Sequence, residues 1–202
     1  MRPGRTCLAL ALLFALAVPG LAAAAATTYT VDAVHSTVGF SVRHFVTRVP
    51  GEFNEFEGTI VHDPENLGAS KVEFTVQAAS IDTDNDQRDG HLKSEDFFAV
   101  EQHPTLTFKS KKISGSGDEV RVTGDLTIRG VTKEVTVPVE VLGTMGPKAG
   151  FATEFKINRT DYGVTWNRAA EGGGTILSDE VTIRIDVEAE KAEMAESAAS
   201  SE

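Results

Sequence analysis

The segment Glu119–Arg129 reads EVRVTGDLTIR, and its apolar side chains fall at every second position from Val120 to Ile128, apart from one glycine. Charged and hydroxyl residues occupy the positions between them. Successive side chains of a β-strand point to opposite faces of the sheet, so this alternation is typical of a strand with one buried face and one wet face. The segment therefore predicts a half-buried strand.

The same alternation returns at seven further places. It is strongest in segments 135–141 and 181–187, where valine and isoleucine alternate with mostly polar residues. Whether residues 29–31 form a short additional strand stays open. We therefore expect eight strands, the shorter or weaker ones lying at 38–42, 56–60, 72–76, 106–108 and 151–157.

The connections between these segments indicate how the strands are joined. Arg129-Gly130 is a link of hairpin length, and glycine-rich stretches at 115–118 and 143–150 provide further short connections. Strands joined in this way are antiparallel neighbours, and up-and-down order lets the last strand pair with the first and remove both sheet edges. We predict an all-β fold, a closed eight-stranded antiparallel barrel, with a two-layer sandwich as the alternative.

Two short helical or irregular insertions interrupt this meander, at 81–103 and 158–178. In the first, the stretch Ser94–Phe98 is expected to start a short helix with Ser94 as its N-cap. Two adjacent phenylalanines, at positions 97 and 98, stand out in this otherwise charged insertion. We interpret them as part of a segment folded over one end of the barrel.

The interior of an eight-stranded barrel is either just filled by its own side chains or just wide enough for one small ligand. Small residues on the inward parity favour an empty interior. The alternative is that these small residues face bulky neighbours across the barrel. The inward phenylalanines could likewise form a filled core, and the sequence leaves both questions open. The small residues are Gly58, Ala78, Ser110, Gly124 and Thr153.

Composition excludes several classes of function. The chain has 202 residues, 41% of them hydrophobic, which suits one domain better than two. Its 19 basic and 30 acidic residues give a net charge of −11, the wrong sign for binding a phosphate backbone, so no nucleic-acid partner is expected. The single cysteine, Cys7, excludes a disulfide framework and cysteine-based zinc sites.

The N-terminal residues 1–26 are typical of a secretory signal peptide. Basic residues Arg2 and Arg5 precede an apolar run, and alanines follow it up to Ala26. The apolar run is too short and too interrupted for a spanning helix, so we expect no stable membrane insertion after cleavage. The mature chain would be exported and free of thiols, with a barrel domain at 27–188 and a disordered acidic tail at 189–202.

No motif points to catalysis or to a metal. The five histidines show no metal-ligand spacing, and no nucleophile elbow is present. The segment Asp82–Gln87 begins like a calcium loop, but Gln87 replaces its glycine and Lys93 replaces its bidentate glutamate. We therefore predict a protein that is not an enzyme, with no catalytic residue, no metal and no cofactor.

Five separated blocks, in order, give the chain from Tyr29 to Glu188 a family resemblance. It resembles the YceI-like family of bacterial periplasmic polyisoprenoid-binding proteins, which have a lipocalin-like barrel. The resemblance implies a periplasmic location and an apolar interior that binds or carries a long isoprenoid or related lipid, such as a polyprenyl chain, a quinone side chain or a fatty amide. The blocks are Asp32–His44, Arg88–Phe98, Pro104–Ser110, Gly124–Lys133 and Asn158–Asn167.

The expected ligand-binding residues fall into three groups. Inward phenylalanines are expected to line the interior, aromatic residues of the insertions to shape one end, and two polar residues to bind a headgroup. A structural ion pair and a loop hydrogen bond are the alternatives for the polar pair. The groups are Phe40, Phe56, Phe74, Phe108, Phe151 and Phe155; then Phe97, Phe98, Tyr162 and Trp166; then Arg88 and His91.

Several rival hypotheses stay open. The first is a structural or stress-response envelope protein whose barrel is filled and which acts through protein contacts. The second is a metal-assisted hydrolase that uses converging histidines. Two partner hypotheses also remain: a membrane cytochrome or other quinone-handling protein, and a second copy of the chain in a homodimer.

Overall fold

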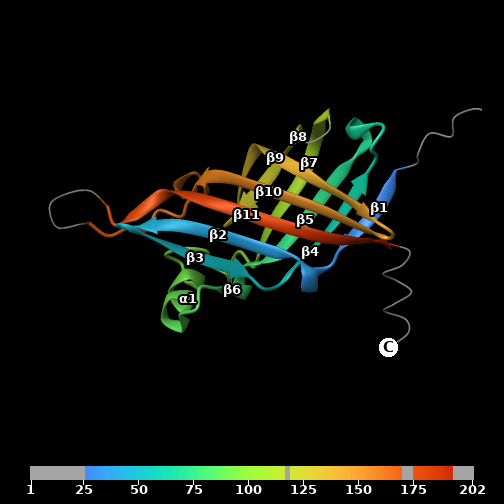
Figure 1. Cartoon of the computed structure of the whole chain (residues 1–202). Helices are drawn as coiled ribbons and strands as arrows, with labels where there is room; N and C mark the ends of the chain where they lie inside the picture. The colour runs from blue at the N-terminus through green and yellow to red at the C-terminus, as the bar shows by residue number, and fades with distance from the viewer. Residues whose placement is uncertain (1–25, 117–118, 170–174, 193–202) are drawn as a thin grey trace, which may run out of the picture.

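The computed structural model describes residues 26–116, 119–169 and 175–192 (Figure 1). Almost all of the expected signal peptide and the last ten residues of the expected tail lie outside these ranges. No helix among the described residues is long and apolar enough to cross a membrane. The strands are β1 Thr27–Val31, β2 Thr37–His44, β3 Thr47–Phe53, β4 Phe56–His62, β5 Lys71–Gln77, β6 Ile81–Asp82, β7 Thr105–Ser116, β8 Glu119–Ile128, β9 Val131–Met145, β10 Lys148–Asn158 and β11 Leu177–Lys191.

The strands close into a barrel with eight strand positions around its circumference, which we call staves. Each of the first two staves is interrupted: β1 and β2 lie end to end along one edge of β11, and β4 and β3 follow each other beside them. β5, β7, β8, β9, β10 and β11 supply one stave each, and β11 pairs with β1 to close the ring. Every pairing is antiparallel, which confirms the predicted all-β, eight-stranded antiparallel barrel.

Hairpin geometry explains the connections. In the link between β8 and β9, Arg129 has φ 51° and Gly130 has φ 72°, and two positive φ values are the requirement of a type I′ hairpin turn. This confirms the hairpin predicted there. β2 and β3 are joined by a second two-residue loop, Phe45-Val46, where His44 pairs with Thr47.

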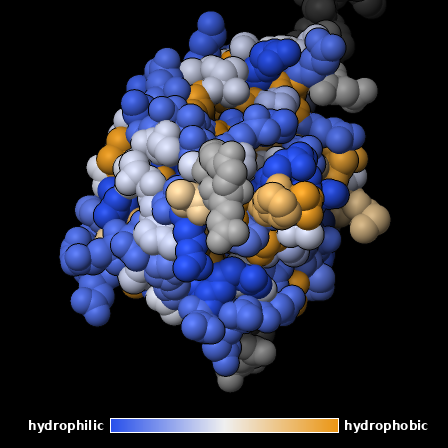
Figure 2. Space-filling view, turned by 90° about the vertical axis from the view of Figure 1, so that its left-hand side faces the viewer, coloured by the Kyte–Doolittle hydropathy of each residue, from blue (hydrophilic) through white to orange (hydrophobic). Residues whose placement is uncertain are grey.

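Both insertions lie at one end of the barrel, which we call the hairpin end because the β2–β3 loop is there too (Figure 1). The side chain of Arg129, in the β8–β9 turn, joins them: Nη2 donates to the carbonyl of Glu95 at 2.7 Å, and Nη1 donates to that of Gly163. Figure 2 faces this end and shows small hydrophobic patches within a mostly hydrophilic surface. The opposite end, where β1 begins and β11 stops, is the termini end.

The helix of the first insertion lies before the predicted position. α1 spans Asp86–Lys93, and Asn85 caps it by accepting a hydrogen bond from the amide of Arg88 at 2.9 Å. Ser94 terminates this helix, since its amide donates to the carbonyl of His91 at 3.1 Å. The prediction of a helix starting at Ser94 is therefore wrong, because asparagine caps an N-terminus as well as serine does and Asn85 precedes it. Short 3₁₀ helices complete the fold: η1 Ala33–His35, η2 Leu67–Ala69, η3 Ala78–Ser80 and η4 Arg159–Tyr162.

The barrel also extends further toward the C-terminus than expected. β11 continues to Lys191, so the first three residues of the expected acidic tail belong to the barrel wall. Ala189 is fully buried and pairs with both Val31 and Ala149. The inward alternation of Val187 and Ala189 was hidden by the alanine- and glutamate-rich composition of this segment.

Candidate functional site: an apolar cavity along the barrel

A cavity of about 690 Å³ occupies the interior of the barrel. Its lining runs from His44, Val49 and Leu177 at the hairpin end to His62 and Val141 near the termini end. Binding pockets for small molecules typically measure about 300–1,000 Å³ and are mostly apolar. The interior is therefore not filled by its own side chains, contrary to the filled-barrel alternative.

Eleven of the twelve predicted ligand-binding residues line this cavity. The exception is Phe56, whose ring stacks on that of Phe74 with centroids 5.8 Å apart and an interplanar angle of 19°. Phe53 lines the cavity instead, and it was missed because Pro50 and Gly51 obscure the alternation of β3. The residues that line the cavity as predicted are Phe40, Phe74, Arg88, His91, Phe97, Phe98, Phe108, Phe151, Phe155, Tyr162 and Trp166.

Glycines on the inner face determine where several phenylalanine rings lie. A Cβ atom added at Gly58 would lie 2.5 Å from Cδ2 of Phe74, directly opposite on the neighbouring strand. A Cβ atom at Gly124 would lie 2.7 Å from Cζ of Phe108. Gly51 stands in the same relation to Phe40, its cross-strand partner. Each ring thus lies against bare backbone of the wall, which leaves the centre of the barrel open.

A polar network lies beside the cavity where β6 leads into α1. Nε of Arg88 donates to Oγ1 of Thr83 at 2.7 Å, and Nη2 of the same guanidinium donates to the Thr83 carbonyl at 2.6 Å. Oγ1 of Thr83 in turn donates to the buried Asp89 carboxylate at 2.5 Å. Nη1 of Arg88 has no hydrogen-bond partner among the described residues, and Arg88 lines the cavity. The guanidinium is therefore fixed in position with one donor group left for a ligand.

His91 lies in an aromatic corner at the hairpin end. Its ring makes edge contacts with Phe97 at 5.0 Å and with Trp166 at 4.9 Å between centroids, so the two insertions meet here. Its Nε2 atom forms a hydrogen bond of 2.8 Å with Oδ2 of Asp96. These contacts are those expected if His91 has a structural role in the loop, although His91 also lines the cavity.

Arg159 holds the second insertion against the barrel, and sequence reasoning missed it. Arg159 is buried, with only 5% of the residue exposed. The guanidinium donates to the carbonyls of Val164 and Trp166, both at 2.8 Å, and to Oδ1 of Asp179 at 2.9 Å. Burial lowers the pKa of Arg159, while Asp179 opposes that effect. These bonds fix the segment that carries Trp166 and Tyr162, and burial raises the pKa of Tyr162.

His62 is a titratable group in the cavity wall near the termini end. It is half-buried at the end of β4 and meets the ring of Phe151 edge-on at 5.9 Å. Burial lowers the pKa of His62 below its usual value, and the neighbouring Asp63 partly opposes this shift. The neutral imidazole is therefore favoured here.

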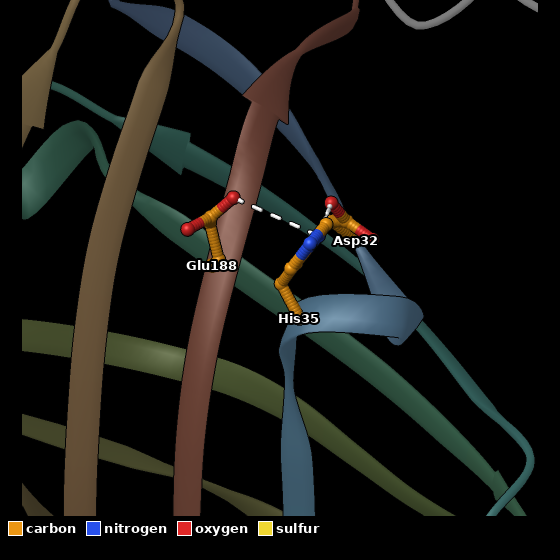
Figure 3. Close-up of side chains that lie close together, drawn as sticks. All are labelled: Asp32, His35 and Glu188. Atoms are coloured by element: carbon orange, nitrogen blue, oxygen red, sulfur yellow. Dashed lines mark hydrogen bonds and ion pairs between the residues drawn. The ribbon is translucent and has the colours of Figure 1, made fainter.

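Asp32, His35 and Glu188 form a cluster (Figure 3), and none of the three lines the cavity. Nδ1 of His35 is 2.7 Å from Oδ2 of Asp32 and 3.9 Å from Oε1 of Glu188. The hydrogen bond with His35 is the main reason why the pKa of Asp32 is lowered. One nitrogen and two oxygens could ligate zinc. However, Oε1 of Glu188 is already paired with the ammonium of Lys148, which would repel a cation.

This cluster instead fastens the interruption between β1 and β2 to β11. The amide of Asp32 donates to the Glu188 carbonyl at 2.9 Å. The hydroxyl of Ser36 donates to the same carbonyl at 3.1 Å and accepts from the Glu188 amide at 3.0 Å. Side chains here replace the strand pairing that η1 interrupts. The block Asp32–His44 in the sequence thus has a structural explanation.

The fold and the site together define a class: a closed antiparallel β-barrel with an apolar cavity along its axis. A family model described as the YceI-like domain matches residues 29–189. The chain belongs to the YceI-like family. A UPF0312 protein of Staphylococcus aureus (strain bovine RF122 / ET3-1) is 36% identical over 169 residues, covering 80% of this chain and 96% of that protein.

Solved structures share the architecture. BcnA of Burkholderia cenocepacia matches with a TM-score of 0.72 and 28% identity, covering 78% of this chain and 98% of that one. The YceI protein of Campylobacter jejuni matches with a TM-score of 0.64 and 34% identity, covering 72% and 86%. A polyisoprenoid-binding domain from Saccharophagus degradans has the same fold, with a TM-score of 0.64 at 16% identity and coverage of 82% and 99%.

Proposed function

We propose that this protein binds and carries a long-chain isoprenoid or related lipid in the bacterial periplasm, without catalysing a reaction. The observation that carries the proposal is the apolar cavity that runs along the barrel and is lined by all eight staves. Membership of the YceI-like family supports the proposal. So does the domain from Saccharophagus degradans, which shares the fold and is described as polyisoprenoid-binding.

The energetics favour a long chain over a small ligand. Burying apolar chain is worth about 0.8 kcal/mol per methylene, whereas association costs about 4–15 kcal/mol of lost freedom. A ligand of many carbons is therefore needed to leave useful affinity. The elongated cavity, closed on its sides by the sheet, suits a single extended tail.

Arg88 supplies the candidate headgroup contact. Arg88 lines the cavity from α1, and its Nη1 group, which has no partner among the described residues, would donate to a phosphate, carbonyl or hydroxyl oxygen of the lipid. Phe97 and Phe98 line the same region, so the first units of the tail would meet aromatic rings. The quinone-handling partner and the homodimer stay predictions.

Native mass spectrometry of the purified mature protein, before and after adding a long-chain polyprenol, tests the proposal. We expect a co-purified or added lipid at one per barrel and a rise in melting temperature, because a ligand that binds only the folded state stabilises it. If neither a lipid adduct nor any stabilisation is found with polyprenols, quinones or fatty amides, the proposal is wrong.

A matched pair of variants makes the test specific to the cavity. Ile183 on β11 lines the cavity, whereas its neighbour Thr182 does not. Ile183→Trp should fill the interior and abolish the lipid adduct, while Thr182→Trp should keep it. Loss of the adduct in both variants, or in neither, would contradict binding inside the barrel.

A further inference from the structure

The loop between β2 and β3 exposes two apolar residues at the hairpin end. Phe45 is 68% exposed and Val46 is 71% exposed, although most apolar side chains of the barrel face inward. The amide of Phe45 donates to the carbonyl of Ile176 at 2.7 Å, so its backbone is held in place. An exposed aromatic residue beside a branched aliphatic one at the tip of a fixed hairpin calls for an explanation beyond folding.

The backbone at this tip makes phenylalanine an unfavourable choice. Phe45 has φ 54°, in the left-handed region that glycine, asparagine and aspartate adopt readily and bulky residues rarely do. Strained conformations of this kind concentrate at functional sites. Stability alone would favour asparagine or glycine at this position.

Two arginines lie directly behind the tip. Arg43 and Arg48 are cross-strand partners, both exposed, and neither has an ion pair or side-chain hydrogen bond within the described part of the chain. Like charges directly opposite one another destabilise a strand pair. Both arginines add to the lowering of the pKa of Glu180, but the main cause is the hydrogen bond from Lys156, 2.8 Å away. The hairpin therefore presents positive charge on a chain whose net charge is −11.

The hairpin also adjoins the cavity. Val42 and Val49, the pair next to the arginines, line it, and so does His44 at the base of the loop. A surface that covers Phe45 and Val46 would thus lie next to the hairpin end of the cavity. In Figure 2, hydrophobic atoms come to the surface at this end within a largely hydrophilic face.

We propose that residues 43–48 form a membrane-docking finger for an anionic phospholipid bilayer. Phe45 and Val46 enter the interface between headgroups and acyl chains, and Arg43 and Arg48 bind lipid phosphates. This inference rests on the proposed function, because docking brings the hairpin end of the cavity to the source of its lipid. The charge of the finger selects an anionic bilayer over a neutral one.

Co-sedimentation with vesicles tests the docking finger. The mature protein is mixed with vesicles of phosphatidylglycerol and phosphatidylcholine, or of phosphatidylcholine alone. Phe45→Asn with Val46→Thr removes the apolar tip while suiting the left-handed backbone, so the hairpin should stay folded. Arg43→Gln with Arg48→Gln removes the charge. The matched control is Leu142→Gln with Met145→Gln, which removes two apolar residues, 60% and 79% exposed, near the termini end.

We expect the unaltered protein to bind the anionic vesicles and to bind the neutral ones less. The tip variant should bind about tenfold more weakly, as expected from losing a buried phenylalanine. The arginine variant should also lose about tenfold on anionic vesicles and little on neutral ones. The control should stay within about twofold of the unaltered protein, since its substitutions lie away from the finger.

Two results would overturn the inference: no vesicle binding by the unaltered protein, or equal loss in the tip variant and the control. Native mass spectrometry on the same samples keeps this test separate from the proposed function. Tip-dependent vesicle binding without a lipid adduct would leave the docking finger standing and reject carriage. A lipid adduct without vesicle binding would reject the finger alone.

Discussion

Gly58 and Phe74 face each other across the β4–β5 pair, and the phenyl ring occupies the space that a side chain at position 58 would fill. The same relation recurs between Gly51 and Phe40. A barrel rich in phenylalanine can therefore keep an empty centre, because the rings of Phe40, Phe74 and Phe108 lie against glycine backbone of the wall. This arrangement makes the inner glycines part of the candidate binding site.

Replacing Gly124 with alanine should destabilise the protein. The new Cβ atom would lie 2.5 Å from the backbone carbonyl oxygen of Lys109 and 2.7 Å from Cζ of Phe108, and the backbone atom cannot easily move away. Overpacking of this kind costs about 1–3 kcal/mol. Urea denaturation measures the free energy of unfolding.

The matched control for that experiment is Gly90→Ala in α1, where an added Cβ meets nothing within 4 Å. Alanine favours a helix over glycine by about 1 kcal/mol, so this variant should be as stable as the unaltered protein or more so. Equal unfolding free energies for the two variants would show that the inner wall tolerates side chains at position 124.

Replacing Arg88 with glutamine should weaken binding of lipids with an oxygen-bearing head. A hydrogen bond to a charged group contributes about 1.5–3 kcal/mol, which corresponds to at least about tenfold in affinity. Binding of an unsubstituted hydrocarbon such as squalene should stay within about twofold, since it offers no acceptor. Titration of both ligands, followed by the fluorescence of the single tryptophan, Trp166, measures the difference.

Equal losses for both ligands would instead assign Arg88 a structural role through its bonds to Thr83. The reading of His91 as a headgroup ligand can be tested in the same way. His91→Gln would lose the aromatic contacts with Phe97 and Trp166, so a purely structural role predicts a lower melting temperature with unchanged preference between the two ligands.

Stability should depend on pH through His62. Its pKa is lowered by burial from the usual value of 6.5, so between 6.5 and the lower folded value the unfolded chain binds more protons than the folded one. The free energy of unfolding should therefore fall as the pH drops from about 6.5 and become level below the folded pKa. Urea denaturation of lipid-free protein from about pH 8 to pH 5 measures this dependence.

His62→Gln is the control, because the amide does not titrate and still fits a half-buried position. The variant should show a flatter profile across the same range. A profile as steep as that of the unaltered protein would assign the dependence to another group.

The sequence predicted the barrel because alternation has one physical cause: the wall separates a dry side from a wet side along every strand. Segments such as Val120–Ile128 and 181–187 carry that pattern openly, and the pairing of β11 with β1 confirms closure. Alternation did not predict the strand correctly where a small residue occupies an inward-facing position. Ala189 and Gly51 are such positions, and the end of β11 and the role of Phe53 were missed for that reason.

The sequence alone could not decide whether the interior of the barrel is empty or filled. Both readings of the small inward residues contain part of the answer: Gly58 and Gly124 do face bulky rings, yet those rings lie along the wall and the cavity remains. Phe56 shows the limit of predicting lining residues from alternation. Its inward position predicted that it lines the cavity, but its ring stacks on Phe74 and does not line it. The role of Arg159 could not be predicted from its local sequence, because its partners, backbone carbonyls and the Asp179 carboxylate, are brought together only by the fold.

Tyr29 pairs with Lys191 where the sheet closes, so the polypeptide enters and leaves the barrel at neighbouring points, far from the β2–β3 loop (Figure 1). A fluorescent label, a purification handle or a surface tether attached next to Tyr29 or Lys191 would sit at the termini end of the barrel. Such attachments would leave the hairpin end unobstructed, and an immobilised barrel would present that end outward in a uniform orientation.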